Sequence, residues 1–183
     1  MYTMKNTIIV NLYGGPGTGK STGAAYIFSK LKMQGIDAEY VTEFAKDKVW
    51  EGSPEAFKCQ FYISGKQAFR VSRCFGKVDI IVTDSPIRLG KVYTDRPALQ
   101  AACTEEANRY RNCSLDIFLR RTKSYNPNGR NQTEEESNNL DQRIRDMLIA
   151  DAVEYIVADG SIEGYDQVFD IVMDKFSSMR QFN

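Results

Sequence analysis

Apolar runs alternate with amphipathic stretches along the 183 residues of the chain. The apolar runs are short and rich in β-branched residues, which is typical of buried parallel strands. They predict strands at 7–13, 38–44, 78–85, 115–121 and 154–160. The amphipathic stretches predict helices at 20–34, 53–75, 97–111, 133–150 and 165–178. Strands that alternate with helices predict an α/β fold with a doubly wound, five-stranded parallel sheet and helices on both faces.

Local signals support several of these boundaries. Gly35 is suited to end the first helix, and Ser53 followed by Pro54 is a helix-start pair. Thr133 and Glu136 have the spacing of a capping box. The segment 122–132 is rich in Asn, Pro and Gly and is expected to be a loop. No repeat or linker interrupts the pattern, so residues 1–183 are expected to form one domain with a lid at about 121–133.

The most specific motif follows the first predicted strand. The sequence NLYGGPGTGKSTGAA contains the pattern G-x-x-x-x-G-K-[ST], with Gly14, Gly19, Lys20 and Ser21 at the specified positions. Such a loop points backbone N–H groups at phosphate oxygens, and the following helix adds its positive end. Lys20 is expected to neutralise the β- and γ-phosphates of ATP, and Ser21 to bind Mg²⁺. The residues expected to bind ATP are Gly15, Gly17, Thr18, Gly19, Lys20, Ser21 and Thr22.

A carboxylate ends the third predicted strand. Asp84 follows Ile80–Ile81–Val82 and can reach Mg²⁺ directly or through water, which is the Walker B role. The alternative is an acidic cap on the turn before Pro86. ATPases of the AAA+ type usually place a glutamate after this aspartate to orient a water, but here Ser85 follows. This difference favours phosphate transfer to another acceptor over hydrolysis.

A catalytic base must be a carboxylate, a lysine, a tyrosine or water, because the chain has no histidine. Glu43 is predicted at the carboxyl end of the second strand, beside the phosphate loop, where doubly wound sheets place their sites. Asp47 is one helical turn further on and competes for the same role. Both acids can also be solvated surface groups or helix caps.

Two segments are basic. Residues 109–130 contain six basic side chains and one acid, Asp116, and residues 58–77 contain five basic side chains and no acid. The first segment includes the proposed lid, from which Arg121 and Arg130 could stabilise charge on the transferring group. Solvated surface charge is the alternative. In the second segment, Gln60 and Gln67 share a helix face and could contact a base, although packing against the sheet is the favoured explanation for such residues.

The amino-acid composition narrows the possible functions only slightly further. The 24 basic and 24 acidic residues balance, so bulk charge predicts neither nucleic-acid nor membrane binding. The four cysteines contain no C-x-x-C pair and fit free thiols. No signal peptide or long apolar span is visible, which favours a cytoplasmic protein without a membrane partner.

Taken together, GGPGTGKST, VTEFAKD, VDIIVTDSP and YNPNGRNQTEEE resemble small P-loop kinases of the thymidylate-kinase and nucleoside-kinase group. They also resemble phage-encoded kinases of 5-hydroxymethyluracil in DNA. The resemblance implies ATP and Mg²⁺ as cofactors, with Mg²⁺ on Ser21 and Asp84. It also implies catalytic roles for Lys20, Glu43, Asp84, Arg121 and Arg130.

The acceptor stays open at this stage. DSP stands where thymidylate kinases carry an Asp-Arg motif, and TEFAKD replaces their arginine-rich acceptor motif. Both differences suit a neutral hydroxyl that needs a base, such as the hydroxymethyl group of a modified pyrimidine in DNA within an infected bacterial cell. A free nucleoside or nucleoside monophosphate is the alternative, and a P-loop ATPase or switch protein is a second one. The oligomeric state is open, with a homodimer as one option.

The motif yields a first prediction. Lys20→Ala should lower the rate of phosphate transfer by about 10³-fold, because the variant loses a charge that stabilises the transferring phosphoryl group. A transfer assay measures the rate, and circular dichroism checks that the fold survives. A rate within about threefold of the parent protein would remove the phosphate-loop assignment.

Overall fold

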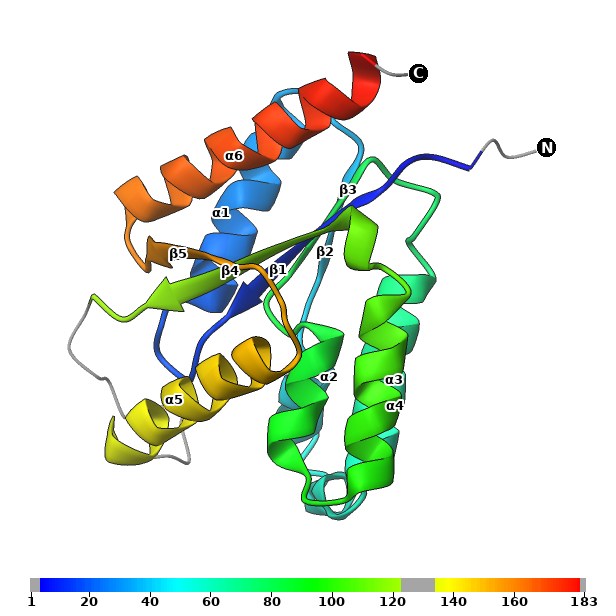
Figure 1. Cartoon of the computed structure of the whole chain (residues 1–183), viewed down its shortest axis with the longest axis vertical. Helices are drawn as coiled ribbons and strands as arrows, with labels where there is room; N and C mark the ends of the chain where they lie inside the picture. The colour runs from blue at the N-terminus through cyan, green and yellow to red at the C-terminus, as the bar shows by residue number, and fades with distance from the viewer. Residues whose placement is uncertain (1–3, 123–133, 182–183) are drawn as a thin grey trace.

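A computed structural model describes residues 4–122 and 134–181. Its centre is a five-stranded sheet in which all neighbouring strands are parallel, in the order β2-β3-β1-β4-β5. The strands are β1 (Ile8–Tyr13), β2 (Ala38–Val41), β3 (Ile80–Thr83), β4 (Ser114–Arg120) and β5 (Ile156–Asp159). Figure 1 shows this sheet between helices on both faces. The predicted fold class is therefore confirmed.

The helices alternate with the strands along the chain. The α-helices are α1 (Lys20–Met33), α2 (Phe44–Trp50), α3 (Gln60–Ser72), α4 (Pro97–Asn108), α5 (Glu134–Ala150) and α6 (Ile162–Gln181). The 3₁₀ helices are η1 (Pro54–Lys58), η2 (Ile87–Tyr93) and η3 (Arg111–Cys113). Among the described residues, no helix is long and apolar enough to cross a bilayer.

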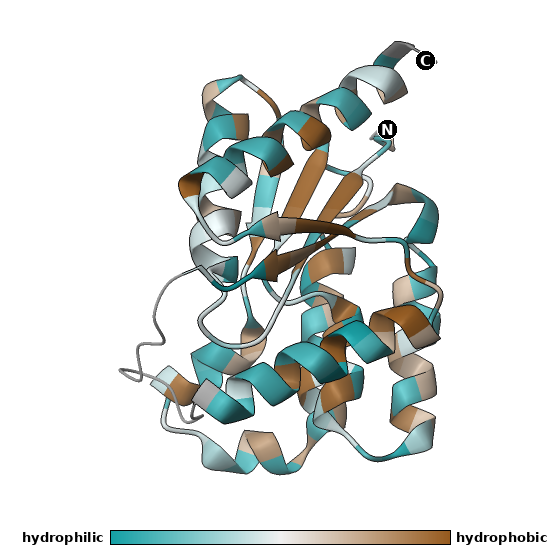
Figure 2. Ribbon diagram, turned by 60° about the vertical axis from the view of Figure 1, so that its left-hand side comes forward, coloured by the Kyte–Doolittle hydropathy of each residue, from teal (hydrophilic) through white to brown (hydrophobic). Residues whose placement is uncertain are grey.

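The two faces of the sheet are built differently. On one face, Ile8, Val10 and Leu12 of β1 pack with α1 and α6 in one continuous apolar cluster. On the other face the core consists of two separate clusters, one under α5 around Phe118 and one beside α3 and α4 around Ile81. The strands are the most hydrophobic part of the molecule in Figure 2, while the helices carry much more polar surface. Alternate residues of β1, β3 and β4 thus belong to the cores on opposite faces of the sheet.

Several boundaries differ from the sequence prediction. The helix predicted at 53–75 is two elements, η1 and α3, because Cys59 has an extended backbone (φ −123°, ψ 82°) between them. The second strand ends at Val41 instead of residue 44, since Phe44 already begins the short helix α2. The sequence prediction lacked both α2 and η2. Gly35 does follow the end of α1 with φ +72°, as expected. Thr133, and with it the capping box, lies outside the described residues.

A nearly buried charge cluster ties η2 to the end of α5. Arg88 and Lys91 both form salt bridges with Asp151, and the Arg88 and Asp151 side chains are only 5% and 10% exposed. Arg88 also donates to Asn108 Oδ1 at 2.7 Å. This cluster holds the segment after Asp84 against the helix that covers the phosphate loop.

Removal of the shared acid should therefore destabilise the fold. Asp151→Ala leaves two cations partly buried without their carboxylate, which costs about 3–5 kcal/mol for a buried pair. We expect the melting temperature to fall by about 10 °C, whereas Asp174→Ala, at an exposed position of α6, should change it little. Equal small shifts in the two variants, measured by calorimetry, would contradict this role for Asp151.

Candidate functional site

The glycine-rich loop joins β1 to α1 at the carboxyl edge of the sheet. Gly17 and Gly19 have φ values of +84° and +90°, a region that side chains disfavour. A Cβ atom at Gly19 would also lie 2.2 Å from the hydroxyl oxygen of Tyr165, which donates to the Gly19 carbonyl. Backbone conformation and close packing therefore both require glycine at position 19.

The first turn of α1 carries no acidic residue, so its positive end is left for an anion. Lys20 curls back over the loop and donates to the carbonyl oxygens of Gly14 and Gly15 at 2.6 and 2.9 Å. Burial lowers the pKa of Lys20, while the charges of Glu43, Asp84 and Asp141 act in the opposite direction. The ammonium group thus lies within electrostatic reach of three carboxylates.

Asp84 directly follows β3 and is 6% exposed. Its Oδ2 atom accepts a hydrogen bond of 2.8 Å from the Tyr40 hydroxyl, whereas its buried Oδ1 atom has no partner among the described residues. A buried carboxylate oxygen without a partner is costly unless a ligand uses it. A Mg²⁺ ion fits this position, because it prefers oxygen ligands and takes few of them from the protein. Asp84 and the Ser21 hydroxyl would hold the ion beside the phosphates.

Sequence reasoning did not identify Tyr40 as part of this site. Its hydroxyl lies 3.5 Å from the Ser21 carbonyl oxygen and also contacts Asp84. Burial and the negative charge of Asp84 raise the pKa of Tyr40, so the group stays a neutral donor. Tyr40 therefore links the two residues expected to bind metal. Only its place on the second predicted strand could have suggested this.

Glu43 is the N-cap residue of α2, two residues beyond β2, whereas the sequence prediction placed it within the carboxyl end of the strand. Burial raises the pKa of Glu43, the Lys20 charge lowers it, and the Asp84 charge raises it. Glu43, Lys20 and Asp84 therefore lie within electrostatic reach of one another at the carboxyl edge. A carboxylate with a raised pKa in such a place is suited to accept a proton.

Gln67 of α3 holds the backbone on both sides of Glu43. Its side chain is nearly buried, accepts from the Phe44 N–H at 2.8 Å and donates to the Thr42 carbonyl at 3.4 Å. The oxygen and the nitrogen of the Gln67 amide are thus both hydrogen-bonded within the chain. This supports a role for Gln67 in positioning Glu43 rather than in contacting a nucleobase. Asp47, the alternative base, forms a salt bridge with Arg70 and is 42% exposed.

Arg121, which follows β4, contacts two residues of α5 that in turn contact the glycine-rich loop. Its guanidinium donates to Ser137 Oγ at 2.6 Å and to Asp141 Oδ2 at 3.0 Å. The Ser137 hydroxyl in turn donates to the Pro16 carbonyl at 2.7 Å, and the other oxygen of Asp141 accepts from the Gly15 N–H. Ser137 and Asp141 were not predicted as site residues, because nothing in their local sequence indicates that α5 lies over the loop.

The other predicted residues lie as follows. Gly15 is buried under α5, since a Cβ atom there would lie 2.8 Å from Asp141 Oδ1. Thr18 is buried and donates to the Gly15 carbonyl at 3.0 Å. Ser21 and Thr22 are exposed in the first turn of α1. Arg130 and most of the predicted lid lie outside the described residues. The loop, Glu43, Asp84 and Arg121 thus share one site.

The sheet order, the glycine-rich loop after β1 and the acid after β3 define a P-loop NTPase fold. The chain belongs to the AAA domain family AAA_28, whose model matches residues 9–164. Its fold is similar to that of a deoxyadenosine kinase from M. mycoides, solved with the products dCMP and a flexible dCDP bound. The TM-score is 0.57 at 17% sequence identity, over 93% of this chain and 100% of that chain. No curated protein matches the chain.

The unsatisfied oxygen of Asp84 yields a metal prediction. Asp84→Asn should raise the Mg²⁺ concentration needed for half-maximal activity by about tenfold, because a neutral amide is a poorer ligand for a hard cation. The melting temperature should change far less. A Mg²⁺ titration of the reaction rate tests this, and an unchanged midpoint would assign Asp84 to a structural cap.

Proposed function

We propose that this protein is a Mg²⁺- and ATP-dependent kinase that transfers the γ-phosphate to a hydroxyl group of a nucleoside-type acceptor. The observation that carries the proposal is that Glu43, Lys20 and Asp84 lie within electrostatic reach of one another at the carboxyl edge of the sheet. Phosphoryl transfer needs a charge clamp on the phosphates and a base for a neutral hydroxyl. This chain has groups of both kinds in one place.

Each group has one role in the proposed reaction. The loop amides and Lys20 bind the phosphates, and Ser21 and Asp84 hold Mg²⁺. Glu43 accepts the proton of the acceptor hydroxyl while the oxygen of that hydroxyl bonds to the γ-phosphorus. The bond from the γ-phosphorus to the bridging oxygen breaks, and ADP leaves. Arg121, and Arg130 from the lid, balance the charge on the transferring group.

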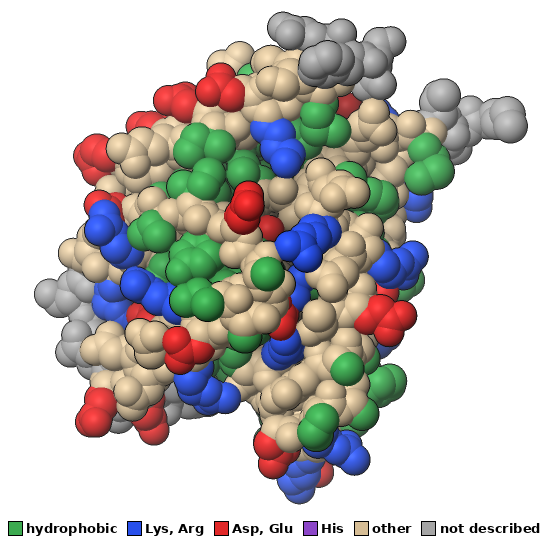
Figure 3. Space-filling model, viewed as in Figure 1, with side chains coloured by type: hydrophobic (Ala, Val, Ile, Leu, Met, Phe, Trp, Pro, Cys, Tyr) green, Lys and Arg blue, Asp and Glu red, His purple; other side chains and the backbone are tan. Residues whose placement is uncertain are grey.

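As the acceptor, we propose a free nucleoside in preference to a modified pyrimidine in DNA. The fold neutralises several cations of the basic segment 109–130, because Arg109, Arg120 and Arg121 form salt bridges with Glu106, Asp159 and Asp141. Acidic and basic side chains also lie interspersed on the face seen in Figure 3. DNA binding draws its affinity from cations that face the backbone. The DNA acceptor therefore rests on the family resemblance, and on the exposed rings of Phe61 and Phe69 on α3.

An ATPase is the second candidate, because the matching family is an AAA domain family. In that case water would take the place of the acceptor hydroxyl. Ser85, which follows Asp84, offers no carboxylate to orient a water. A reaction with ATP labelled at the γ-phosphate separates the two functions.

The labelled reaction compares nucleosides, nucleoside monophosphates and single-stranded DNA that contains 5-hydroxymethyluracil. We expect label on a free nucleoside, with little dependence on salt. Preferred labelling of DNA that weakens steeply with salt would replace the nucleoside by the DNA base as acceptor. Release of inorganic phosphate with every acceptor tried would overturn the kinase assignment.

The base assignment makes a pH prediction. Glu43 acts only when deprotonated, so kcat should fall as the pH drops through its pKa, which burial raises above the ordinary value of 4.5. Glu43→Gln should lower kcat by about 10²–10⁴-fold and remove this acid limb, because the amide cannot accept a proton. The affinity for ATP should change little.

Asp47→Asn is the matched control for this prediction. Because Asp47 is engaged by Arg70, the control should keep kcat within about threefold and retain the acid limb. If Asp47→Asn lost the acid limb while Glu43→Gln retained it, Asp47 would be the base in place of Glu43.

A further inference from the structure

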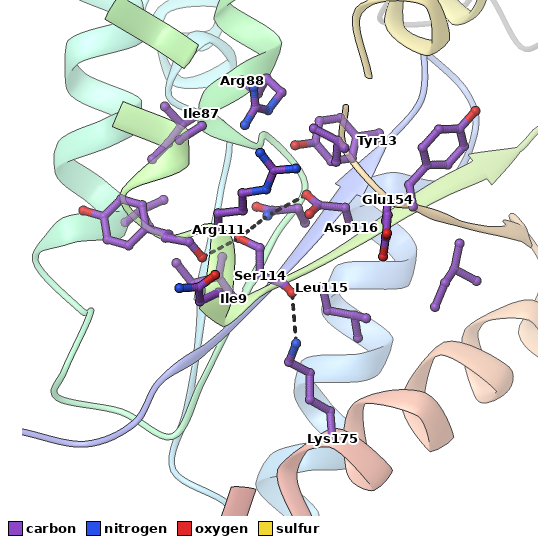
Figure 4. Close-up of a pocket in the computed structure, with 18 residues that line it drawn as sticks. Ile9, Tyr13, Ile87, Arg88, Arg111, Ser114, Leu115, Asp116, Glu154 and Lys175 are labelled. Atoms are coloured by element: carbon purple, nitrogen blue, oxygen red, sulfur yellow. Dashed lines mark hydrogen bonds between the residues drawn. The ribbon is translucent and has the colours of Figure 1, made fainter. Parts of the chain in front are cut away.

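A second cavity lies away from the phosphate loop, on the sheet face that carries α3, α4 and α5. Its volume is about 650 Å³, within the range of small-molecule sites. β1, β4, η2, the end of α4, the segment 153–156 and α6 line it, as Figure 4 shows in part. Lys20, Glu43 and Asp84 do not line it. The proposed kinase reaction thus leaves this cavity unused.

The cavity separates the two apolar clusters of this face. Between them lie Asn11 and Asp116, which are directly opposite each other on β1 and β4. Asn11 interrupts the apolar run of β1. A polar side chain in a buried strand is unfavourable unless it forms hydrogen bonds. β5 begins opposite Ile117, so residues 114–116 have no strand beside them on that side. The face is therefore open and polar at this point.

The floor of the cavity has acceptor capacity left. Asn11 Nδ2 donates to Asp116 Oδ1 at 3.0 Å and to Ser114 Oγ at 3.4 Å, and the Ser114 hydroxyl donates to the Tyr110 carbonyl at 3.0 Å. These donors are thus turned toward protein acceptors. The carboxylate of Asp116 and the amide oxygen of Asn11 can accept further hydrogen bonds. A ligand that contacts the floor must therefore bring donors.

The rim has the opposite character. The Arg111 guanidinium donates to the Ala152 carbonyl at 2.6 Å, and the Lys175 ammonium donates to the Ser114 carbonyl at 3.1 Å. Within the described part of the chain, neither cation forms a salt bridge. Figure 4 shows Lys175 extending from α6 to the Ser114 carbonyl, at the edge of the floor. A ligand that contacts the rim must bring an anion.

The remaining charged and aromatic groups agree with this division. Arg88 lines the cavity and forms a salt bridge with Asp151, and its charge also opposes the burial that raises the pKa of the Asp116 carboxyl. Glu154 is exposed at the rim. Tyr110 and Tyr155 contribute rings to the wall. Aromatic walls favour a flat ring system between the polar floor and the cationic rim.

We propose that this cavity is a second ligand site, which binds a nucleoside monophosphate whose base carries an exocyclic amino group. The amino group donates to Asp116 and Asn11, and the phosphate accepts from Arg111 and Lys175. Asn11 lies three residues before Gly14, so the ligand contacts the strand that leads into the phosphate loop. The site does not depend on the phosphate transfer proposed above, because binding alone defines it.

Calorimetric titrations with CMP and UMP test the proposal, since the two nucleotides differ at C4, which carries an amino group in CMP and a carbonyl oxygen in UMP, and at N3, which accepts in CMP and donates in UMP. We expect CMP to bind about tenfold more tightly, because its amino group has two donors, one for Asp116 and one for Asn11, whereas UMP has the single N3–H. Asp116→Asn should abolish this preference. Lys175→Met should weaken both nucleotides by about tenfold, and Lys32→Met, at an exposed position of α1, should weaken neither.

Two variants of the kinase site locate the binding. Lys20→Ala and Glu43→Gln should leave the CMP affinity unchanged, and melting temperatures show which variants are folded. Equal affinities for CMP and UMP, or an unchanged affinity in Lys175→Met, would overturn the second site. Loss of CMP binding in Lys20→Ala would place the nucleotide in the phosphate loop instead. None of these outcomes affects the kinase assignment, which the labelled-ATP reaction tests separately.

Discussion

The position of the Lys20 ammonium group is the constraint on which the rest of the site depends. A partly buried cation is costly unless acceptors and opposite charges surround it. Here the Gly14 and Gly15 carbonyls provide the acceptors, and Glu43, Asp84 and Asp141 provide the charges. These carboxylates come from three separate segments of the chain. A parallel sheet brings such segments together, because the carboxyl ends of its strands share one edge.

The same edge connects the loop to the far side of the fold. Ser137 and Asp141 hold α5 on the loop, and Arg121 binds both of them from the end of β4. α5 ends at the cluster of Asp151 with Arg88 and Lys91, which holds η2 behind Asp84. The two sides of the site are therefore mechanically connected through one helix. In the proposed kinase, a phosphate that binds to the loop would compete with Asp141 for the Gly15 N–H and so act on the position of α5.

Much of the fold could be predicted because its signals are local. The apolar β-branched runs identified all five strands, and the spacing of Gly14, Gly19, Lys20 and Ser21 identified the loop. The errors occurred where tertiary contacts decide. Phe44 begins a helix directly after Glu43, since the Gln67 side chain caps the Phe44 N–H from α3. The roles of Tyr40, Ser137 and Asp141 likewise depend on contacts with residues 19 to 126 positions away, and no local pattern encodes such contacts.

The most direct measurement is a crystal structure with a non-hydrolysable ATP analogue, Mg²⁺ and a nucleoside. The account predicts that Lys20 Nζ leaves the Gly14 and Gly15 carbonyls for the β- and γ-phosphate oxygens. It also predicts Asp84 beside Mg²⁺, directly or through water, and Glu43 within hydrogen-bond distance of the acceptor hydroxyl. A bound analogue with Lys20 still on the two carbonyls, or with Glu43 turned away from the nucleoside, would contradict the account.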